Sequence, residues 1–137
     1  LDSVDMEGID TVIIAGMGGL LIADIIKRAP KRGLKYILQP MTLGEELKRF
    51  LFDNGFTVTA EKLAAEDKKI YNIISASDGE EEYSELDLYI GKKLICDPLF
   101  PLYREKLKNK WGKIIRERKK SENADTAYYE ELMEGLA

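Results

Sequence analysis

The chain contains no histidine and only one cysteine, Cys96, among its 137 residues. Protein zinc sites are built mainly from histidine and cysteine, and the Ser-His-Asp and Cys-His catalytic arrangements both need a histidine base. A single cysteine cannot form a disulfide within the chain. These absences exclude the common zinc centres and histidine-based hydrolases, and we expect no metal site.

Long apolar runs are also absent. The longest, Thr11 to Ala23, is interrupted by glycines and is too short to span a bilayer. No signal peptide is visible, which favours a cytoplasmic protein without a membrane partner. The composition, 45% hydrophobic and 34% charged residues, is typical of a folded globular chain.

Charge is segregated along the sequence. Residues 101–120 carry nine Lys or Arg against two Asp or Glu, whereas residues 121–137 carry five acidic residues and no basic ones. Residues 1–100 are mildly acidic, with 12 basic and 18 acidic residues. The positive charge is therefore concentrated in one block of twenty residues.

The first elements are predicted to be a strand, a glycine turn and a helix. Asp10 to Ala15 is a β-branched apolar run, as in a strand buried in a parallel sheet, and Leu20 to Arg28 follows as a helix. Between them, Gly16-Met17-Gly18-Gly19 predicts a tight turn, where a ligand can approach the backbone closely.

Further elements continue the alternation of strands and helices. We expect a strand over Leu34 to Leu38 that Gln39-Pro40 ends, and then a helix with a capping box from Thr42 to Glu45 that ends at Gly55. Two strands, Phe56 to Leu63 and Ile70 to Ala76, are predicted to form an antiparallel hairpin across the polar residues 64–69. The order strand-helix-strand-helix-strand-strand indicates an open α/β sheet.

Two amphipathic helices are predicted in the last forty residues. Leu99, Tyr103, Leu107, Trp111 and Ile115 recur every four residues after Asp97-Pro98, which favours a long helix with Asp97 as its N-cap. A shorter helix carries Ala124, Tyr128, Leu132 and Leu136. We expect an antiparallel, coiled-coil-like hairpin whose basic arm faces an acidic arm, and Trp111 and Tyr103 in its core.

The glycine turn alone leaves several functions open. A dinucleotide-binding Gly-x-Gly-x-x-Gly would need glycine where Leu21 stands and an acidic residue where Gln39-Pro40 ends the next strand, and a phosphate-binding P-loop would need a Lys-Ser/Thr pair. An NAD(P)-binding oxidoreductase domain, a non-enzymatic interaction module and a purely structural turn therefore remain as alternatives.

Several sequence blocks together resemble the bacterial tRNA (adenine-22-N1)-methyltransferase family. They are Ile9 to Gly19, Ile37-Leu38-Gln39-Pro40, Asp53-Asn54-Gly55-Phe56 and Glu66-Asp67-Lys68-Lys69-Ile70-Tyr71, in matching order and spacing. The resemblance implies a class I enzyme dependent on S-adenosylmethionine. It departs from the family at Met41 and Asn72, where Asn and Glu are common.

The resemblance also implies a Rossmann-like sheet of order 3-2-1-4-5-7-6, of which this chain supplies the contiguous part 4-5-7-6. The expected organisation is a partial methyltransferase domain (1–77), a linker (78–97) and a helical hairpin (98–137). The half that binds most of the S-adenosylmethionine is then absent, and we expect the chain to be inactive alone. Its strand at Asp10 to Ala15 becomes an unpaired inner edge, which predicts association with another copy.

The resemblance assigns roles to particular residues. Gly16, Met17, Gly18 and Gly19 form the catalytic acceptor-side loop, Ala15 and Gly16 lie at the cofactor, and Gln39 and Pro40 line the pocket for the adenine. The tRNA backbone is expected to bind the basic block, namely Arg104, Lys106, Lys108, Lys110, Lys113, Arg116, Lys119 and Lys120. An ordinary solvated helix face is the alternative for this block.

Overall fold

The computed structural model describes residues 5, 7–29, 33–121 and 125–136. Two compact units divide the chain between Asp97 and Pro98. The first contains β1 (Thr11–Met17), α1 (Gly19–Lys27), β2 (Lys35–Pro40), α2 (Gly44–Asp53), β3 (Phe56–Glu66), β4 (Lys69–Asp78) and the short 3-10 helices Leu86–Leu88 and Lys92–Leu94; the second contains α3 (Phe100–Lys119) and α4 (Ala127–Leu136).

The four strands form one mixed sheet in the order β1-β2-β4-β3. β1 and β2 are parallel, whereas β4 runs antiparallel to both β2 and β3. This order is the 4-5-7-6 arrangement that the resemblance implies, with β1 at one edge of the sheet. The expected α/β class is confirmed.

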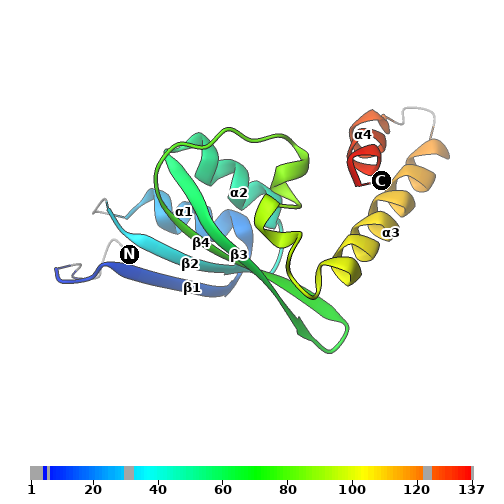
Figure 1. Cartoon of the computed structure of the whole chain (residues 1–137). Coiled ribbons are helices and arrows are strands. Elements are labelled where there is room, and N and C mark those ends of the chain that lie inside the picture. The colour runs from blue at the N-terminus through cyan, green and yellow to red at the C-terminus, as the bar shows by residue number, and fades with distance from the viewer. Residues whose placement is uncertain (1–4, 6, 30–32, 122–124, 137) are drawn as a thin grey trace. The chain divides into compact units, whose positions relative to one another are not determined.

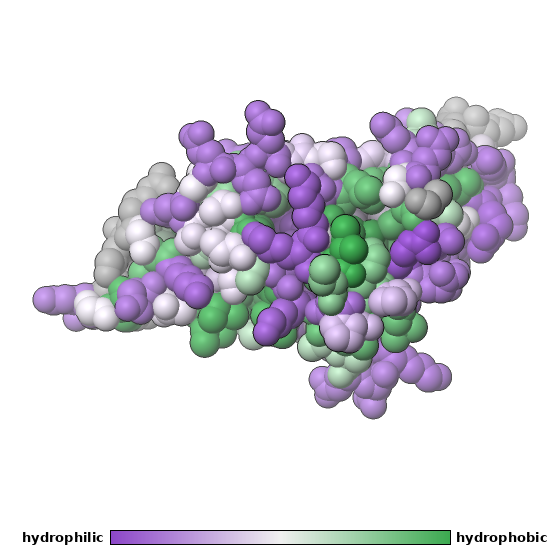
Figure 2. All heavy atoms as spheres, in the orientation of Figure 1, coloured by the Kyte–Doolittle hydropathy of each residue, from purple (hydrophilic) through white to green (hydrophobic). Residues whose placement is uncertain are grey.

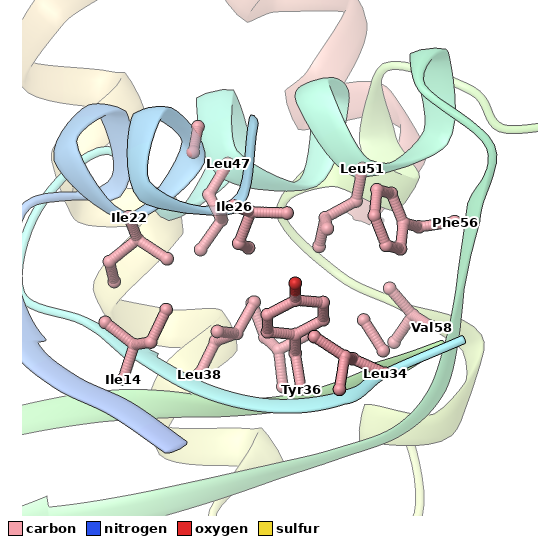
Figure 3. Close-up of a cluster of buried hydrophobic side chains, with 13 residues drawn as sticks. Ile14, Ile22, Ile26, Leu34, Tyr36, Leu38, Leu47, Leu51, Phe56 and Val58 are labelled. Carbon is pink, nitrogen blue, oxygen red and sulfur yellow. The ribbon is translucent and has the colours of Figure 1, made fainter. Parts of the chain in front are cut away.

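Helices α1 and α2 cover one face of the sheet (Figure 1). Alternate strand residues point to this face because successive side chains of a strand point to opposite sides. Figure 3 shows Ile14, Tyr36 and Leu38 of the sheet below Ile22 and Leu47 of the two helices, all of them buried. These side chains form the core of the first unit, and each of the large ones contributes about 1.5–3 kcal/mol of apolar burial.

Two predicted element boundaries in this unit are wrong. Strand β1 continues through Gly16 and Met17, so the glycine turn shrinks to Gly18. Strand β2 includes Pro40 because β4 pairs with β2 only up to Leu38, and no β4 carbonyl needs a donor at Pro40.

The predicted capping box of α2 does not form. The helix begins at Gly44, and its N-cap is Leu43, a left-handed residue with φ 51° and no side-chain cap. The C-terminal end agrees with the prediction, since Gly55 has φ +82° just beyond the helix.

The predicted β3–β4 hairpin is confirmed, with a tighter turn than expected. Glu66 pairs with Lys69, so only Asp67 and Lys68 connect the strands, and Asp67 has φ 54°. Much of the polar stretch that we expected to separate the strands is thus part of the ladder.

Residues 78–97, expected as a linker, lie within the first unit. Leu88 and Leu94 are buried, and the Lys48 ammonium beneath them donates to the Asp87 carbonyl at 2.6 Å. Asp97 accepts a hydrogen bond from the Leu63 amide at 2.9 Å, so it does not cap α3 as predicted. The N-cap of α3 is Leu99, with a proline in the first turn.

The second unit is a hairpin of two helices. Leu107, Trp111, Leu132 and Leu136 are buried between them, as the four-residue spacing predicts. Antiparallel packing follows from two contacts: Arg104 near the start of α3 donates to the Leu136 carbonyl, and Lys119 at its end pairs with Glu130. Ala124 lies outside the described residues.

Candidate functional site

The carboxyl ends of β1 and β2 lie side by side because the two strands are parallel. Gly16 interrupts their register as a bulge between Ala15 and Met17, and its φ of +77° is a conformation that favours glycine. A side chain added at Gly16 would meet nothing within 4 Å, so the space in front of it is open.

Gln39 bridges the two strand ends. Its Oε1 accepts a hydrogen bond from the Gly16 amide at 2.9 Å, and its Nε2 lies 3.3 Å from the Met41 sulfur. The side-chain amide thus holds the bulged backbone of β1 in place from the neighbouring strand.

The loop after β2 packs tightly on the start of α1. The Gly19 amide donates to the Thr42 carbonyl at 2.7 Å, and the Met41 amide donates to the Met17 carbonyl at 2.8 Å. A Cβ at Gly19 would lie 2.2 Å from the Leu43 carbonyl oxygen, so a side chain at this position is excluded. Leu43 itself has a left-handed φ of 51°, and its carbonyl lies against Gly19.

We call residues 15–19 and 39–43 together the acceptor rim. None of these ten residues is ionisable. Three of its large apolar side chains are exposed, at 38% for Met17, 44% for Met41 and 45% for Leu43. Such a surface suits a flat, neutral ligand, and its chemistry is restricted to alignment because it offers no acid or base.

The rim brings together seven of the predicted site residues: Ala15, Gly16, Met17, Gly18, Gly19, Gln39 and Pro40. Met41, Thr42 and Leu43 complete it. The sequence marked Met41 only as a departure from the family pattern, and it gave Thr42 and Leu43 no place in the site. Thr42 resembled a helix cap, and no sequence signal marks Leu43 as left-handed because leucine rarely adopts that conformation.

The predicted tRNA-binding residues lie on α3, with Lys120 as its C-cap, in the second unit. Five of them are exposed along one side of the helix, and we call them the basic stripe. Its members are Lys106, Lys110, Lys113, Arg116 and Lys120.

Other members of the predicted set face α4. Arg104 donates its guanidinium protons to the Leu136 carbonyl, and the Lys119 ammonium lies 3.3 Å from Glu130. A hydrogen bond from the Thr126 hydroxyl and the nearby Lys119 hold the pKa of Glu130 below its usual value. Within the stripe, Lys113 lies 3.9 Å from Glu117 one turn on.

Over the ranges that the structure describes, no group of His, Cys, Asp and Glu is placed to hold a metal ion. Within the same ranges, no helix is both long and apolar enough to cross a membrane.

The sheet argues against a dinucleotide-binding domain. That fold uses parallel strands and leaves the helix N-terminus open to a pyrophosphate. Here β4 is antiparallel, and the first amide of α1, that of Gly19, is already bonded to Thr42.

The family model of the tRNA (adenine(22)-N(1))-methyltransferases matches residues 1–136. The chain is 27% identical over 141 residues to the Bacillus subtilis tRNA (adenine(22)-N(1))-methyltransferase, covering 93% of this chain and 58% of the relative. The chain is also 33% identical over 86 residues to a Mycoplasma pneumoniae relative, and this match covers 61% of this chain and 40% of that protein. The chain thus spans about half the length of the curated relatives it matches.

A solved structure shows the same fold. Streptococcus pneumoniae Sp1610, crystallised with S-adenosyl-L-methionine, has a TM-score of 0.74 and 28% identity, with 93% of this chain and 59% of that one covered. The family match, the sheet order and the acceptor rim agree with one another. The chain belongs to the tRNA (adenine(22)-N(1))-methyltransferase family.

Proposed function

We propose that the protein carrying this chain transfers a methyl group from S-adenosylmethionine to N1 of an adenine in tRNA. Family membership supports this proposal, as do the name of the Bacillus subtilis relative and the ligand of the Streptococcus pneumoniae structure. The observation that carries it is the acceptor rim, an uncharged surface at the carboxyl ends of two parallel strands.

Ala15 and Gly16 border the cofactor in this proposal. Their backbone is exposed, and the open space in front of Gly16 leaves room for a ligand to approach. When bound, S-adenosylmethionine supplies an activated methyl group. Most contacts to it come from strands that the family adds on the β1 side of the sheet.

Gln39 and Pro40 line the pocket for the target base, with Met17, Gly18 and Gly19 opposite them. An adenine has to leave its stack to reach such a pocket. The apolar side chains of Met17 and Met41 suit the faces of the base, and the Gln39–Gly16 hydrogen bond fixes the backbone at its edge. These residues act by alignment, because N1 of adenine already carries a lone pair and needs no base.

The basic stripe of α3 binds the tRNA backbone in this proposal. Four lysines and one arginine lie along one exposed helix face, and such contacts contribute affinity that is independent of sequence. Arg104, Lys108 and Lys119 belong to the same predicted set, but Arg104 and Lys119 already hold α4. Because its substrate is tRNA, we propose the cytoplasm as the place of action.

The edge of β1 is a further proposed contact surface. β1 is the edge strand of the order β1-β2-β4-β3, and the side chain of Ile13, on the face away from the helices, is 69% exposed. Figure 2 shows apolar atoms along this side of the sheet in the orientation of Figure 1. Unpaired strand edges recruit other strands. We propose that two copies of the chain associate through β1 and that the chain alone does not catalyse the reaction.

Methyl transfer to unmodified tRNA tests the function. The full product of the gene encoding this chain is incubated with S-adenosylmethionine and a tRNA transcript, and digested RNA is analysed for 1-methyladenosine by mass spectrometry. We expect 1-methyladenosine with the full product and none with the 137-residue chain. A full product that binds S-adenosylmethionine by calorimetry but forms no methylated adenine in any tRNA would refute the proposed substrate.

A further inference from the structure

The β3–β4 hairpin extends well past the end of β2. Strand β2 pairs with β4 only through residues 36–38 and 74–76, whereas β3 and β4 pair with each other as far as Glu66 and Lys69. Figure 1 shows the free end of the hairpin projecting beyond the other two strands. We call this projecting part, residues 62–73, the arm.

The arm projects from the same end of the sheet as the acceptor rim, the end at which β1 and β2 finish. Leu38 lies opposite Ile74, and β4 is antiparallel to β2, so residues before Ile74 run in the direction of Gln39 and Pro40. The carboxyl ends of β1 and β2 and the tip of the arm therefore lie on one side of the sheet.

One face of the arm carries an aromatic ring between basic side chains. Tyr71 lies directly opposite Ala64, and Lys62 is two pairs further along the ladder, opposite Ile73. Residues two apart on a strand share a face, so Lys69 joins Tyr71 on it. This is the face opposite α1 and α2, because Ile74, on the other face, is buried against the helices.

The face is accessible. The cross-strand neighbour of Tyr71 is Ala64, whose small side chain covers little of the tyrosine, and Tyr71 is partly exposed. Lys62 and Lys69 are exposed. Glu66 lies directly opposite Lys69 on this face, and Asp67 lies in the turn. Figure 2 shows a tip of hydrophilic side chains.

We propose that the arm is a second RNA-binding surface, on which Tyr71 stacks with an unstacked base while Lys62 and Lys69 contact the flanking phosphates. The inference rests on the proposed tRNA substrate. A base-stacking ring with cations beside it is the arrangement by which proteins bind single-stranded nucleic acid. An adenine entering the acceptor rim leaves its neighbours unstacked, and the arm projects from the same end of the sheet as the rim.

RNA binding by arm variants tests the inference. Fluorescence anisotropy is measured with a labelled tRNA transcript and with a labelled 12-nucleotide oligoadenylate, over a range of salt concentrations. We expect Tyr71→Ala to bind both about tenfold more weakly and Tyr71→Phe within about twofold of the unchanged chain, because stacking needs only the ring. Lys62→Gln and Lys69→Gln should each lower the salt slope by about one.

Lys35→Gln is the matched control, since Lys35 is exposed at the opposite, amino end of β2. Circular dichroism verifies that each variant is folded. A second measurement does not depend on substitution: photocross-linking with an oligonucleotide that contains 8-azidoadenosine should label the peptide containing Tyr71.

The inference is wrong if Tyr71→Ala binds as tightly as the unchanged chain, if Tyr71→Phe is as weak as Tyr71→Ala, or if the unchanged chain binds neither RNA at low salt. Methyl transfer by the full gene product is measured separately. If the full product methylates tRNA but the cross-linker does not label the Tyr71 peptide, the proposed function stands and the RNA-binding role of the arm is refuted.

Discussion

The Lys48 ammonium and the Glu61 carboxylate meet inside the first unit, with Nζ 2.5 Å from Oε1 and both side chains almost fully buried. Lys48 comes from α2 and Glu61 from β3, and the Asp87 carbonyl accepts from the same ammonium. Gly91 allows this closeness, because a Cβ there would lie 2.4 Å from Glu61. The pair thus connects a helix, a strand and residues 86–94.

Removing one partner of this pair should destabilise the chain strongly. Lys48→Met leaves a buried carboxylate without its cation, which costs about 3–5 kcal/mol of unfolding free energy. The double variant Lys48→Met, Glu61→Leu should recover most of this loss, since no charge stays buried. Urea unfolding followed by circular dichroism measures both.

Arg49→Gln is the matched control for Lys48. Arg49 is the next residue of α2, and its ion pairs with Glu46 and Glu85 are exposed. We expect a change of at most about 1 kcal/mol. Equal losses for Lys48→Met and Arg49→Gln would contradict the proposed importance of the buried pair.

Gln39 should act by holding Gly16, not by contacting the reacting atoms. Gln39→Ala removes the acceptor of the Gly16 amide and should lower kcat of the full gene product about 10- to 100-fold, the effect of a small misalignment. Gln39→Glu keeps an oxygen in the same place and should retain most of the activity. The pair of variants is compared by initial rates and KM, and a larger loss in Gln39→Glu than in Gln39→Ala would contradict a positioning role.

The basic stripe should dominate the salt dependence of tRNA binding. Replacing Lys110 by Gln removes one phosphate contact, so the slope of log K against log salt should fall by about one. Lys119→Gln is the control, because Lys119 is paired with Glu130. Anisotropy titrations between low and high salt measure the slopes, and unchanged slopes for Lys110→Gln and Lys106→Gln would indicate an ordinary solvated face.

Sequence patterns predicted the strands, the helices and the buried stripe of Leu107 and Trp111, because these depend on local periodicity. The strand order came from the resemblance to the family, since no local pattern specifies which strands pair. The acceptor rim depends on contacts between residues far apart in sequence, such as Gln39 with Gly16, and on the unusual φ of Leu43. No local propensity encodes these, and Lys48 on an amphipathic helix gave no sign of being buried.

Association through β1 should depend on Ile13. This side chain is 69% exposed, so Ile13→Lys should leave the fold intact while placing a charge beside the edge. We expect sedimentation equilibrium to show dimers of the unchanged chain and monomers of Ile13→Lys. Leu102→Lys, at an exposed apolar residue of α3, is the control; monomers in all three samples would remove the self-association proposal.

The helical hairpin should lose a small part of its stability in acid. Because the folded pKa of Glu130 lies below its unfolded value, the carboxylate stabilises the folded state above the unfolded pKa, and this contribution disappears as the pH falls through the folded pKa. NMR titration should show the pKa of Glu130 rising in Thr126→Ala and, to a smaller extent, in Lys119→Gln. Lys113→Gln, whose partner is Glu117, should leave it unchanged.

The two loops of the acceptor rim are joined at three places, by Gly16 with Gln39, Met41 with Met17 and Gly19 with Thr42. Neither loop can move outward without breaking these hydrogen bonds, so the two loops form one rigid wall. In the proposed reaction, we therefore expect the movements that admit and release a nucleotide to come from the parts that face the rim, which leaves the alignment of the acceptor undisturbed.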